Sequence, residues 1–274
     1  MIRDITIGQY YPKESEVHQL DPRVKLAGTF VYMISMFCFH RFLGFLFVSL
    51  FLGWVIKKSD IPFSYIVKGL KPILFLLVFT MVINALFVDG HIIWSWGILK
   101  ISVEGIRKAV FMGIRLSLLV LGASMMTFTT TPNHLTDGLE QMLKPLRKLH
   151  VPVHEISMMM SIALRFIPIL LEETDKIMKA QMARGADFET GGMIKRAKNM
   201  VPLLVPLFVS AFRRANDLAM AMEARCYRGG EGRTKMKPLE YQQADYIAYG
   251  VLAGYIIILM IGLRYIPSIW TIVG

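Results

Sequence analysis

The sequence lacks several motifs that would indicate an enzyme or a metalloprotein. It has only two cysteines, Cys38 and Cys226, in very different contexts, which excludes a disulfide framework and a cysteine metal site. It has no G-x-x-x-x-G-K-[ST] phosphate-binding loop, so any ATP has to be hydrolysed by another chain. No Ser-His-Asp or paired-carboxylate arrangement lies within an apolar segment, which argues against an intramembrane hydrolase.

The histidines are scattered along the chain and form no metal-binding pattern. His150 and His154 are four residues apart, but Pro152 breaks the helix that would bring them together. A glycine-rich stretch at 229–232 follows a predicted helix and has no strand before it, so it is interpreted as a flexible exit and not as a phosphate cradle. The sequence therefore indicates no catalytic, metal or cofactor site in this chain.

Apolar residues, by contrast, are abundant and occur in blocks. Of the 274 residues 54% are hydrophobic, and the mean hydropathy is +0.49, whereas a soluble domain has about 45–50% apolar residues. The net charge of +11 resembles that of a nucleic-acid-binding protein, but the Lys and Arg residues lie between or beside the apolar blocks. The first two dozen residues have no apolar core of a cleavable signal. The pattern predicts an all-α, polytopic membrane protein without a nucleic-acid partner.

Apolar runs long enough to cross a bilayer predict about five transmembrane helices. The stretch 26–56 is too long for one span and is interrupted by His40-Arg41, so we divide it into two short helices joined by a tight turn. The fourth span contains one charge, Arg115, for which four interpretations stay open: snorkelling, an ion pair with Glu104, a contact between helices, or a substrate-binding role. The predicted spans are 24–39, 42–56, 72–88, 107–129 and 244–263.

Basic residues near the span ends predict the orientation. More than half of all Lys and Arg residues lie in 131–240, and others lie before the first span and between the second and third spans. These regions fall on the same side of the membrane, which we expect to be the cytoplasm. The segment 89–106 then forms an external loop in which Trp94 and Trp96 suit the membrane interface, and the C-terminus is external.

Residues 131–240 carry three predicted amphipathic helices. Thr131 and Pro132 open the first one as a cap and an early proline. The second and third are expected at about 153–184 and 193–225, each about 45–50 Å long, which exceeds the thickness of a bilayer core. Their charges argue against simple spans, and three internal prolines are expected to bend them: Pro168, Pro202 and Pro206. The predicted domains are thus an N-terminal membrane domain at 1–130, a cytoplasmic domain at 131–240 and a C-terminal span at 241–274.

The second and third of these helices end with the same short motif. One ends in Ala183-Arg184-Gly185 and the other in Ala224-Arg225-Cys226. A single such motif is explained by the helix dipole, which a C-terminal cation stabilises by about 0.3–1 kcal/mol. Two copies favour a second interpretation, because small neighbours leave a guanidinium free to bind a carboxylate of a partner with both of its arms. A pair of matched arginines suggests a pair of matched partner subunits.

Several motifs together resemble the transmembrane coupling component, or T component, of energy-coupling factor transporters, which is related to the membrane subunit of cobalt and nickel uptake systems. They are Leu20-Asp21-Pro22-Arg23-Val24-Lys25-Leu26, Thr131-Pro132 with Pro145-Leu146, Leu164-Arg165-Phe166-Ile167-Pro168 with Glu172, and the two arginine motifs. The resemblance covers essentially the whole chain. The sequence departs from the pattern at Cys226, where glycine is common.

The resemblance implies a non-catalytic subunit of a bacterial ABC-type importer in the cell membrane. Its expected partners are two cytoplasmic ATPases, which bind ATP and Mg, and one membrane-embedded substrate-binding (S) subunit for a vitamin or another micronutrient. Arg184 and Arg225 would each dock into one ATPase. The long helices would transmit the closure of the ATPase dimer to the S subunit, which would topple in the membrane and release its ligand inside.

The expected S-subunit surface lies on the same two helices. A methionine-rich apolar face can repack against different partners, although methionines that simply fill a core between the helices explain half of them equally well. The residues expected on this surface are Met159, Met160, Phe166, Pro168, Pro202, Pro206 and Phe208. Two other functions stay open at this stage. One is a secondary transporter or channel, which the absence of internal repeats disfavours, and the other is a membrane scaffold without transport.

Overall fold

The structure is a computed structural model that describes residues 10–38, 42–88, 90–96, 99–188, 192–230, 236 and 238–265. It confirms the all-α class, because the regular elements of the described residues are helices apart from one short hairpin. The chain divides into two units, which are described separately. The membrane unit comprises the described residues of Gly8–Leu139 and Leu239–Gly274, and the two-helix unit comprises those of Glu140–Pro238.

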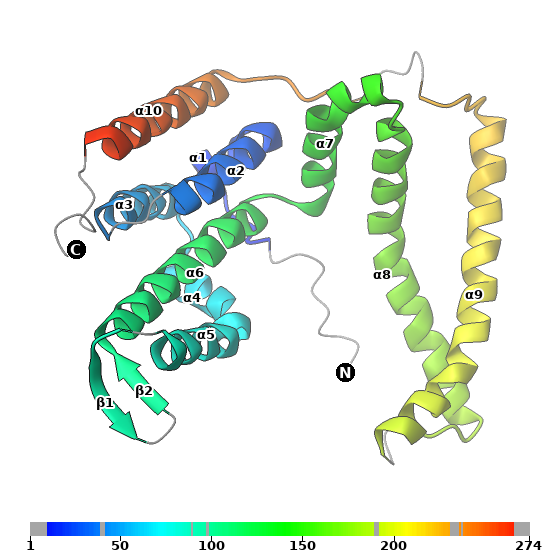
Figure 1. Ribbon diagram of the computed structural model, residues 1–274. Coiled ribbons are helices and arrows are strands. Elements are labelled where there is room, and N and C mark those ends of the chain that lie inside the picture. The colour runs from blue at the N-terminus through cyan, green and yellow to red at the C-terminus, as the bar shows by residue number, and fades with distance from the viewer. Residues whose placement is uncertain are drawn as a thin grey trace. The chain divides into compact units, whose positions relative to one another are not determined.

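The membrane unit is built around one long central helix, α6. This helix packs against α5, α2, α4 and α3, while α10 packs against α2 (Figure 1). The bounds of its helices are α1 Glu16–Gln19, α2 Pro22–Cys38, α3 Phe42–Ser59, α4 Phe63–Leu70, η1 Lys71–Ile73, α5 Leu74–Phe87, α6 Val103–Thr129 and α10 Gln243–Tyr265. Helix α7, Pro132–Leu143, leads from this unit into the other.

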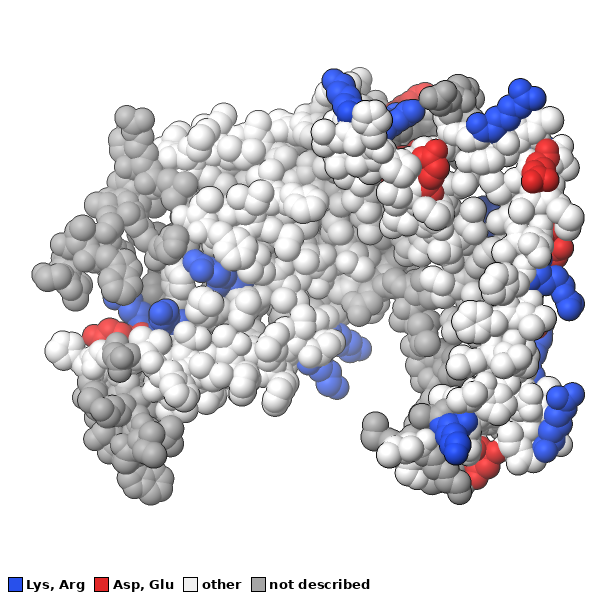
Figure 2. Space-filling view, turned by 45° about the vertical axis from the view of Figure 1, so that its right-hand side comes forward, with Lys and Arg blue, Asp and Glu red and all other residues white. Residues whose placement is uncertain are grey.

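The buried core of the membrane unit contains aromatic, aliphatic and methionine side chains from five of these helices and the α3–α4 connection. They are Tyr32, Met36, Phe45, Val48, Leu52, Ile61, Ile66, Met125, Phe128, Tyr255 and Leu259. Outside this core, many large apolar side chains face outward; Phe75 of α5, for example, is 80% exposed. On the face drawn in Figure 2, uncharged residues cover most of this unit. Such a surface fits lipid as the surrounding solvent and not water.

Four helical segments are long and apolar enough to cross a membrane. Three of them, Phe63–Phe87, Val103–Thr129 and Gln243–Gly262, coincide with the last three predicted spans. The first predicted pair corresponds to α2 and α3, whose 17 and 18 residues span only about 25–27 Å. The predicted turn at His40-Arg41 lies outside the described residues.

The fourth segment, Val153–Ala183, corrects the sequence-based argument that charge content excludes a span in this helix. Most of its charged residues lie at or after Glu172, so the first part of the helix is apolar enough to meet the criterion. A pattern averaged over the whole helix hides this division.

The segment expected as an external loop contains a β-hairpin. Strands β1 (Ile92–Trp96) and β2 (Leu99–Ser102) pair antiparallel, with Trp94 opposite Ile101. Ser102 then caps α6, because its hydroxyl accepts a hydrogen bond from the Gly105 amide at 2.9 Å. The side chains of Trp94 and Trp96 lie outside the described part, so their interfacial role stays a prediction.

The two-helix unit consists mainly of α8 (Val153–Ala183) and α9 (Met193–Ala224), preceded by the 3-10 turn η2 (Lys144–Leu149). Both helices match the predicted bounds to within one residue and continue through their internal prolines. They run antiparallel (Figure 1), and Arg214 of α9 meets Glu173 of α8 at 3.3 Å. At the other end of α8, a Cβ on Gly230 would lie 2.3 Å from Cδ2 of His154. The chain that leaves α9 therefore packs beside the start of α8.

Candidate functional site

Helix α8 ends in a hydrogen-bonded cap at the first arginine motif. The amide of Gly185 donates to the Met182 carbonyl at 2.9 Å, and the amide of Ala186 donates to the Gln181 carbonyl at 3.0 Å. These two bonds define a Schellman cap, whose first residue past the cap lies in the left-handed region. Gly185 has a φ of +90°, which glycine adopts without steric cost.

Helix α9 ends in the same way at the second motif. The amide of Cys226 donates to the Glu223 carbonyl at 2.8 Å, and the amide of Tyr227 donates to the Met222 carbonyl at 3.0 Å. Cys226 occupies the position of Gly185 and has a φ of 56°, although a residue with a Cβ is disfavoured there by roughly 1–2 kcal/mol. The backbone therefore imposes the same cap on both motifs despite the departure at Cys226.

The two caps hold their arginines in nearly the same backbone conformation. Arg184 and Arg225 are the C-cap residues, with φ and ψ of −90° and 7° in one and −91° and 14° in the other. Both side chains are exposed, as are Ala183, Ala224 and both left-handed residues. Neither guanidinium has a hydrogen-bond or ion-pair partner among the residues that the structure describes. Both arginines are thus available to carboxylates of another chain.

The structure separates the two arginines. Arg184 lies where α8 ends and the chain turns toward α9, and Arg225 lies at the opposite end of α9 (Figure 1). With 32 residues, α9 is about 48 Å long if straight. The two motifs are therefore two separate sites and do not form one combined site.

The expected S-subunit residues lie on α8 and α9 and are largely exposed. Met159 is 58% exposed, Met160 40% and Phe208 61%. Pro168 and Pro202 are also exposed, whereas Phe166 and Pro206 are partly buried. The predicted apolar face of α9 around Phe208 is open as well, at Val201, Leu204, Val205 and Phe212. A core-filling role does not describe the exposed methionines Met159, Met160, Met182, Met200 and Met220 in the isolated chain.

Arg115 in α6 lies against aromatic rings. Its Cζ atom is 4.9 Å from the ring centroid of Phe111, 5.6 Å from that of Phe45 and 6.0 Å from that of Phe37. Glu104 accepts a hydrogen bond from the backbone amide of His91 at 2.7 Å. Of the four interpretations of Arg115, the geometry favours the contact between helices, since Phe37 belongs to α2 and Phe45 to α3.

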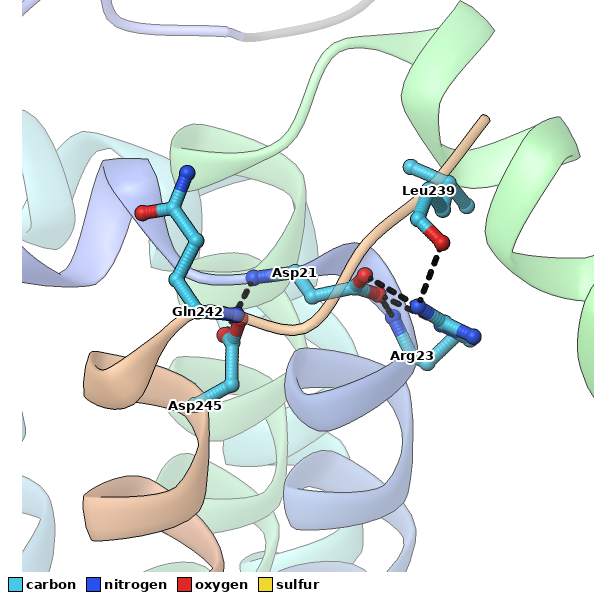
Figure 3. A network of polar contacts seen from close by, with 5 residues as sticks. All are labelled: Asp21, Arg23, Leu239, Gln242 and Asp245. Atoms are coloured by element: carbon cyan, nitrogen blue, oxygen red, sulfur yellow. Dashed lines mark hydrogen bonds and ion pairs between the residues drawn. The ribbon is translucent and has the colours of Figure 1, made fainter. Parts of the chain in front are cut away.

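A polar network at the start of α2 was not predicted as a site. Asp21 caps α2, accepting from the Arg23 amide at 2.8 Å, and binds the Arg23 guanidinium with both oxygens at 2.9 and 2.7 Å (Figure 3). One oxygen of Asp245 accepts from the Asp21 amide and the other from the Gln242 amide, both at 2.8 Å. The second Arg23 arm also donates to the Leu239 carbonyl at 3.1 Å. The hydrogen bonds to Asp21 raise the pKa of Arg23, so the guanidinium stays charged.

The sequence indicated some residues of this network but not their contacts. Asp21, Pro22 and Arg23 belong to a motif that supported the resemblance, but the motif alone assigns no role to them. Their partner Asp245 is 224 residues away in the sequence, and a lone aspartate near a helix start is ordinarily a capping residue. Within the described residues, no group of three His, Cys, Asp or Glu side chains comes together as a metal site.

Comparisons with known proteins agree with this architecture. Residues 13–236 match the family model of CbiQ, described as cobalt transport protein. A protein of Ruminiclostridium cellulolyticum named energy-coupling factor transporter transmembrane protein EcfT is 56% identical over 251 residues, which cover 92% of this chain and 94% of that protein. Proteins of the same name from Clostridium kluyveri and Bacillus subtilis are 54% and 49% identical, over 90% and 89% of this chain and 93% of each relative.

Proposed function

The chain belongs to the CbiQ family and, within it, to the energy-coupling factor transporter transmembrane proteins, and on this premise we propose that it is the coupling subunit of a multi-subunit importer. Its partners are two cytoplasmic ATPases and one membrane-embedded S subunit that binds a vitamin or another micronutrient. The chain catalyses no reaction itself, since ATP and Mg are bound by the ATPases.

One observation carries the proposal: the two arginine motifs have the same cap geometry and are both unpaired within the described chain. Each guanidinium can form a two-armed ion pair with a carboxylate on an ATPase, because alanine and a small left-handed residue leave it uncovered. Because the two motifs form separate sites, they suit two ATPase subunits better than a single ATPase subunit.

The antiparallel helices supply the mechanical link. ATP binding closes the ATPase dimer, and Arg184 and Arg225 carry this movement to opposite ends of the α8–α9 pair. The pair moves as a unit because the two helices pack against each other and the Arg214–Glu173 contact at 3.3 Å joins them. The exposed apolar residues around Met159 and Phe208 then provide the surface that contacts the S subunit.

This function requires residues 131–240 to be accessible from the cytoplasm. The excess of basic residues in this segment supports that orientation, although α8 is also apolar enough to span. Met236 is 94% exposed and offers a labelling position. In a background without Cys38 and Cys226, Met236→Cys should react with a membrane-impermeant maleimide in inside-out vesicles. Reaction in intact cells would contradict the orientation.

Co-purification tests the assignment. The tagged chain, extracted from a bacterial membrane together with its partners, should bring down ATPase subunits in a ratio of two per chain and one S subunit. Reconstituted vesicles should accumulate the S-subunit ligand only with ATP. A chain that purifies alone and transports a solute without ATPases would instead be a secondary transporter, and partners without ATP-dependent uptake would make it a scaffold.

A further inference from the structure

The two chain connections between the units start from the same part of the membrane unit. The two-helix unit begins at Glu140 and ends at Pro238, so Leu139 and Leu239 are the membrane-unit residues next to it. Residues near both connections contact one short segment, 21–26, at the start of α2. This segment spans the Asp21-Pro22-Arg23 motif, to which the coupling role assigns no task.

The first connection passes through α7, where Gly138 packs directly on α2. A Cβ on Gly138 would lie 3.0 Å from the Cβ of Pro22 and 3.2 Å from the Cδ1 of Leu26, so a larger residue would push these neighbours back by a few tenths of an ångström. Upstream of α7, the ammonium group of Lys25 donates to the Thr129 carbonyl at 2.9 Å, at the C-terminal end of α6. Segment 21–26 therefore fixes the chain before and within α7.

The second connection runs from Leu239 into α10. Arg23 donates to the Leu239 carbonyl at 3.1 Å, and its Cζ atom lies 3.8 Å from the centre of the Tyr241 ring. Asp245 bridges the amides of Asp21 and Gln242, at 2.8 Å each (Figure 3). The segment that holds α7 thus also holds the chain that returns from the two-helix unit.

The charged groups of this contact are buried, which makes it rigid. Asp21 is 6% and Asp245 2% exposed, and the Arg23 side chain is 14% exposed. A buried carboxylate tolerates the loss of its partner poorly, because it is left desolvated and unpaired. A movable unit that is attached through two chain segments transmits its motion only where those segments are fixed, since loose segments absorb the displacement themselves.

We propose that Asp21, Arg23 and Asp245 are positioning residues that form a pivot: they fix both connections of the two-helix unit to the N-terminus of α2. This inference rests on the proposed coupling function and deepens it, because the pivot converts movement of α8 and α9 into force on the membrane unit. The pivot touches neither ATP nor the transported solute.

Hydrogen exchange of the purified full-length chain tests whether the connections share one pivot. Arg23→Ala should accelerate amide exchange about tenfold or more in both 133–139 and 239–245. Arg23 contacts Leu239 and Tyr241 directly, and its ion pair with Asp21 holds the first turn of α2, on which Gly138 packs. The matched control is Lys58→Ala, which breaks the exposed pair with Glu16 at 2.8 Å in the same unit; it should leave both segments unchanged. Acceleration in 239–245 alone would overturn the shared pivot.

Uptake measurements on the reconstituted complex test the function of the pivot. With Arg23→Ala, ATP hydrolysis should stay within about twofold of the wild type, while solute taken up per ATP should fall about tenfold. Arg23→Lys keeps the charge but not the two-armed geometry, so it should fold readily and restore part of the ratio. Asp245→Asn should also lower the solute taken up per ATP, because Asp245 holds the amides of Asp21 and Gln242.

The outcomes separate this inference from the proposed function. ATP-dependent uptake by the wild-type complex supports the coupling role whether or not a pivot exists. If the wild-type complex shows such uptake, two results overturn the pivot alone. One is an unchanged ratio of uptake to hydrolysis in Arg23→Ala. The other is a parallel fall of hydrolysis and uptake in Arg23→Ala that is equally large in Arg23→Lys. If the wild-type complex shows no ATP-dependent uptake, the proposed function fails and the pivot's transmitting role is overturned with it.

Discussion

Gly185→Ala adds a side chain at the left-handed position of one helix cap, and Cys226→Gly removes the side chain from the equivalent position of the other cap. At Gly185 a new Cβ would meet no atom within 4 Å, so the change acts only through the backbone φ of +90°. A residue with a Cβ costs roughly 1–2 kcal/mol in this region, and the reduced freedom of the unfolded chain recovers about half of that. The expected effect is about 1 kcal/mol of local destabilisation.

The reverse change at the other motif should have the opposite sign. Cys226 has a φ of 56°, and glycine removes the steric cost there while adding about 0.5–1 kcal/mol of backbone entropy cost. Cys226→Gly should therefore stabilise the cap of α9 by a few tenths to about 1 kcal/mol.

Amide exchange measures both effects where they act. A change of about 1 kcal/mol alters the fraction of molecules in which the cap is open roughly fivefold. In the Gly185→Ala variant, the amides of residues 185 and 186 should therefore exchange about five times faster than in the wild type. The Tyr227 amide in Cys226→Gly should exchange more slowly. Equal changes of the same sign at the two caps would refute the argument that the motifs share one geometry.

Two further predictions concern the membrane unit. Burial, assisted by the charge of Lys25, lowers the pKa of His18 below its ordinary value of 6.5, so folding favours the neutral ring and stability should be lost as the pH falls below about 6.5. Between pH 7.5 and 5, the melting temperature of the detergent-purified chain should drop less in His18→Gln than in the wild type. Equal drops would show that His18 does not cause the loss of stability. Gly122→Ala would place a Cβ 2.2 Å from Cε1 of Tyr32, so it should destabilise the chain by about 1–3 kcal/mol in thermal unfolding. Gly53→Ala, with no atom within 4 Å, is the matched control, and equal melting temperatures would show that α2 and α6 are less closely packed than described.

Local chemistry made the two long helices predictable. Their ends are set by short-range signals, namely an arginine followed by a small residue that accepts the left-handed conformation at Gly185 and Cys226. Thr131 likewise marked the start of α7, where its hydroxyl accepts from the His134 amide at 3.4 Å. These features depend on only a few neighbouring residues, and the sequence displays them directly.

Long-range features were not predictable in the same way. The bond between Asp21 and Asp245 joins residues at opposite ends of the chain, and no periodicity in either segment indicates it. The hairpin of β1 and β2 was taken for a loop, because a short strand pair between two apolar helices has too few residues to form a pattern. The apolar face of α9 was visible as a stripe, but only the structure shows that residues such as Phe212 stay exposed at 67%.

The arginine motifs test the central claim most directly. If Arg184 and Arg225 each form a buried two-armed ion pair with an ATPase, removal of one arginine costs about 3–5 kcal/mol at that site, or roughly a hundred- to several-thousand-fold in affinity. The remaining anchor can hold the complex by avidity, so the decisive variant is Arg184→Ala with Arg225→Ala.

Co-purification of this double variant is the measurement. It should reach the membrane in normal amounts and lose both ATPases, and lysine at both positions should restore little binding, because it offers a point charge and no fork. If the arginines serve only the helix dipoles, each change costs less than about 1 kcal/mol and the assembly survives. A double alanine variant that still brings down both ATPases and supports normal ATP-driven uptake would contradict the account.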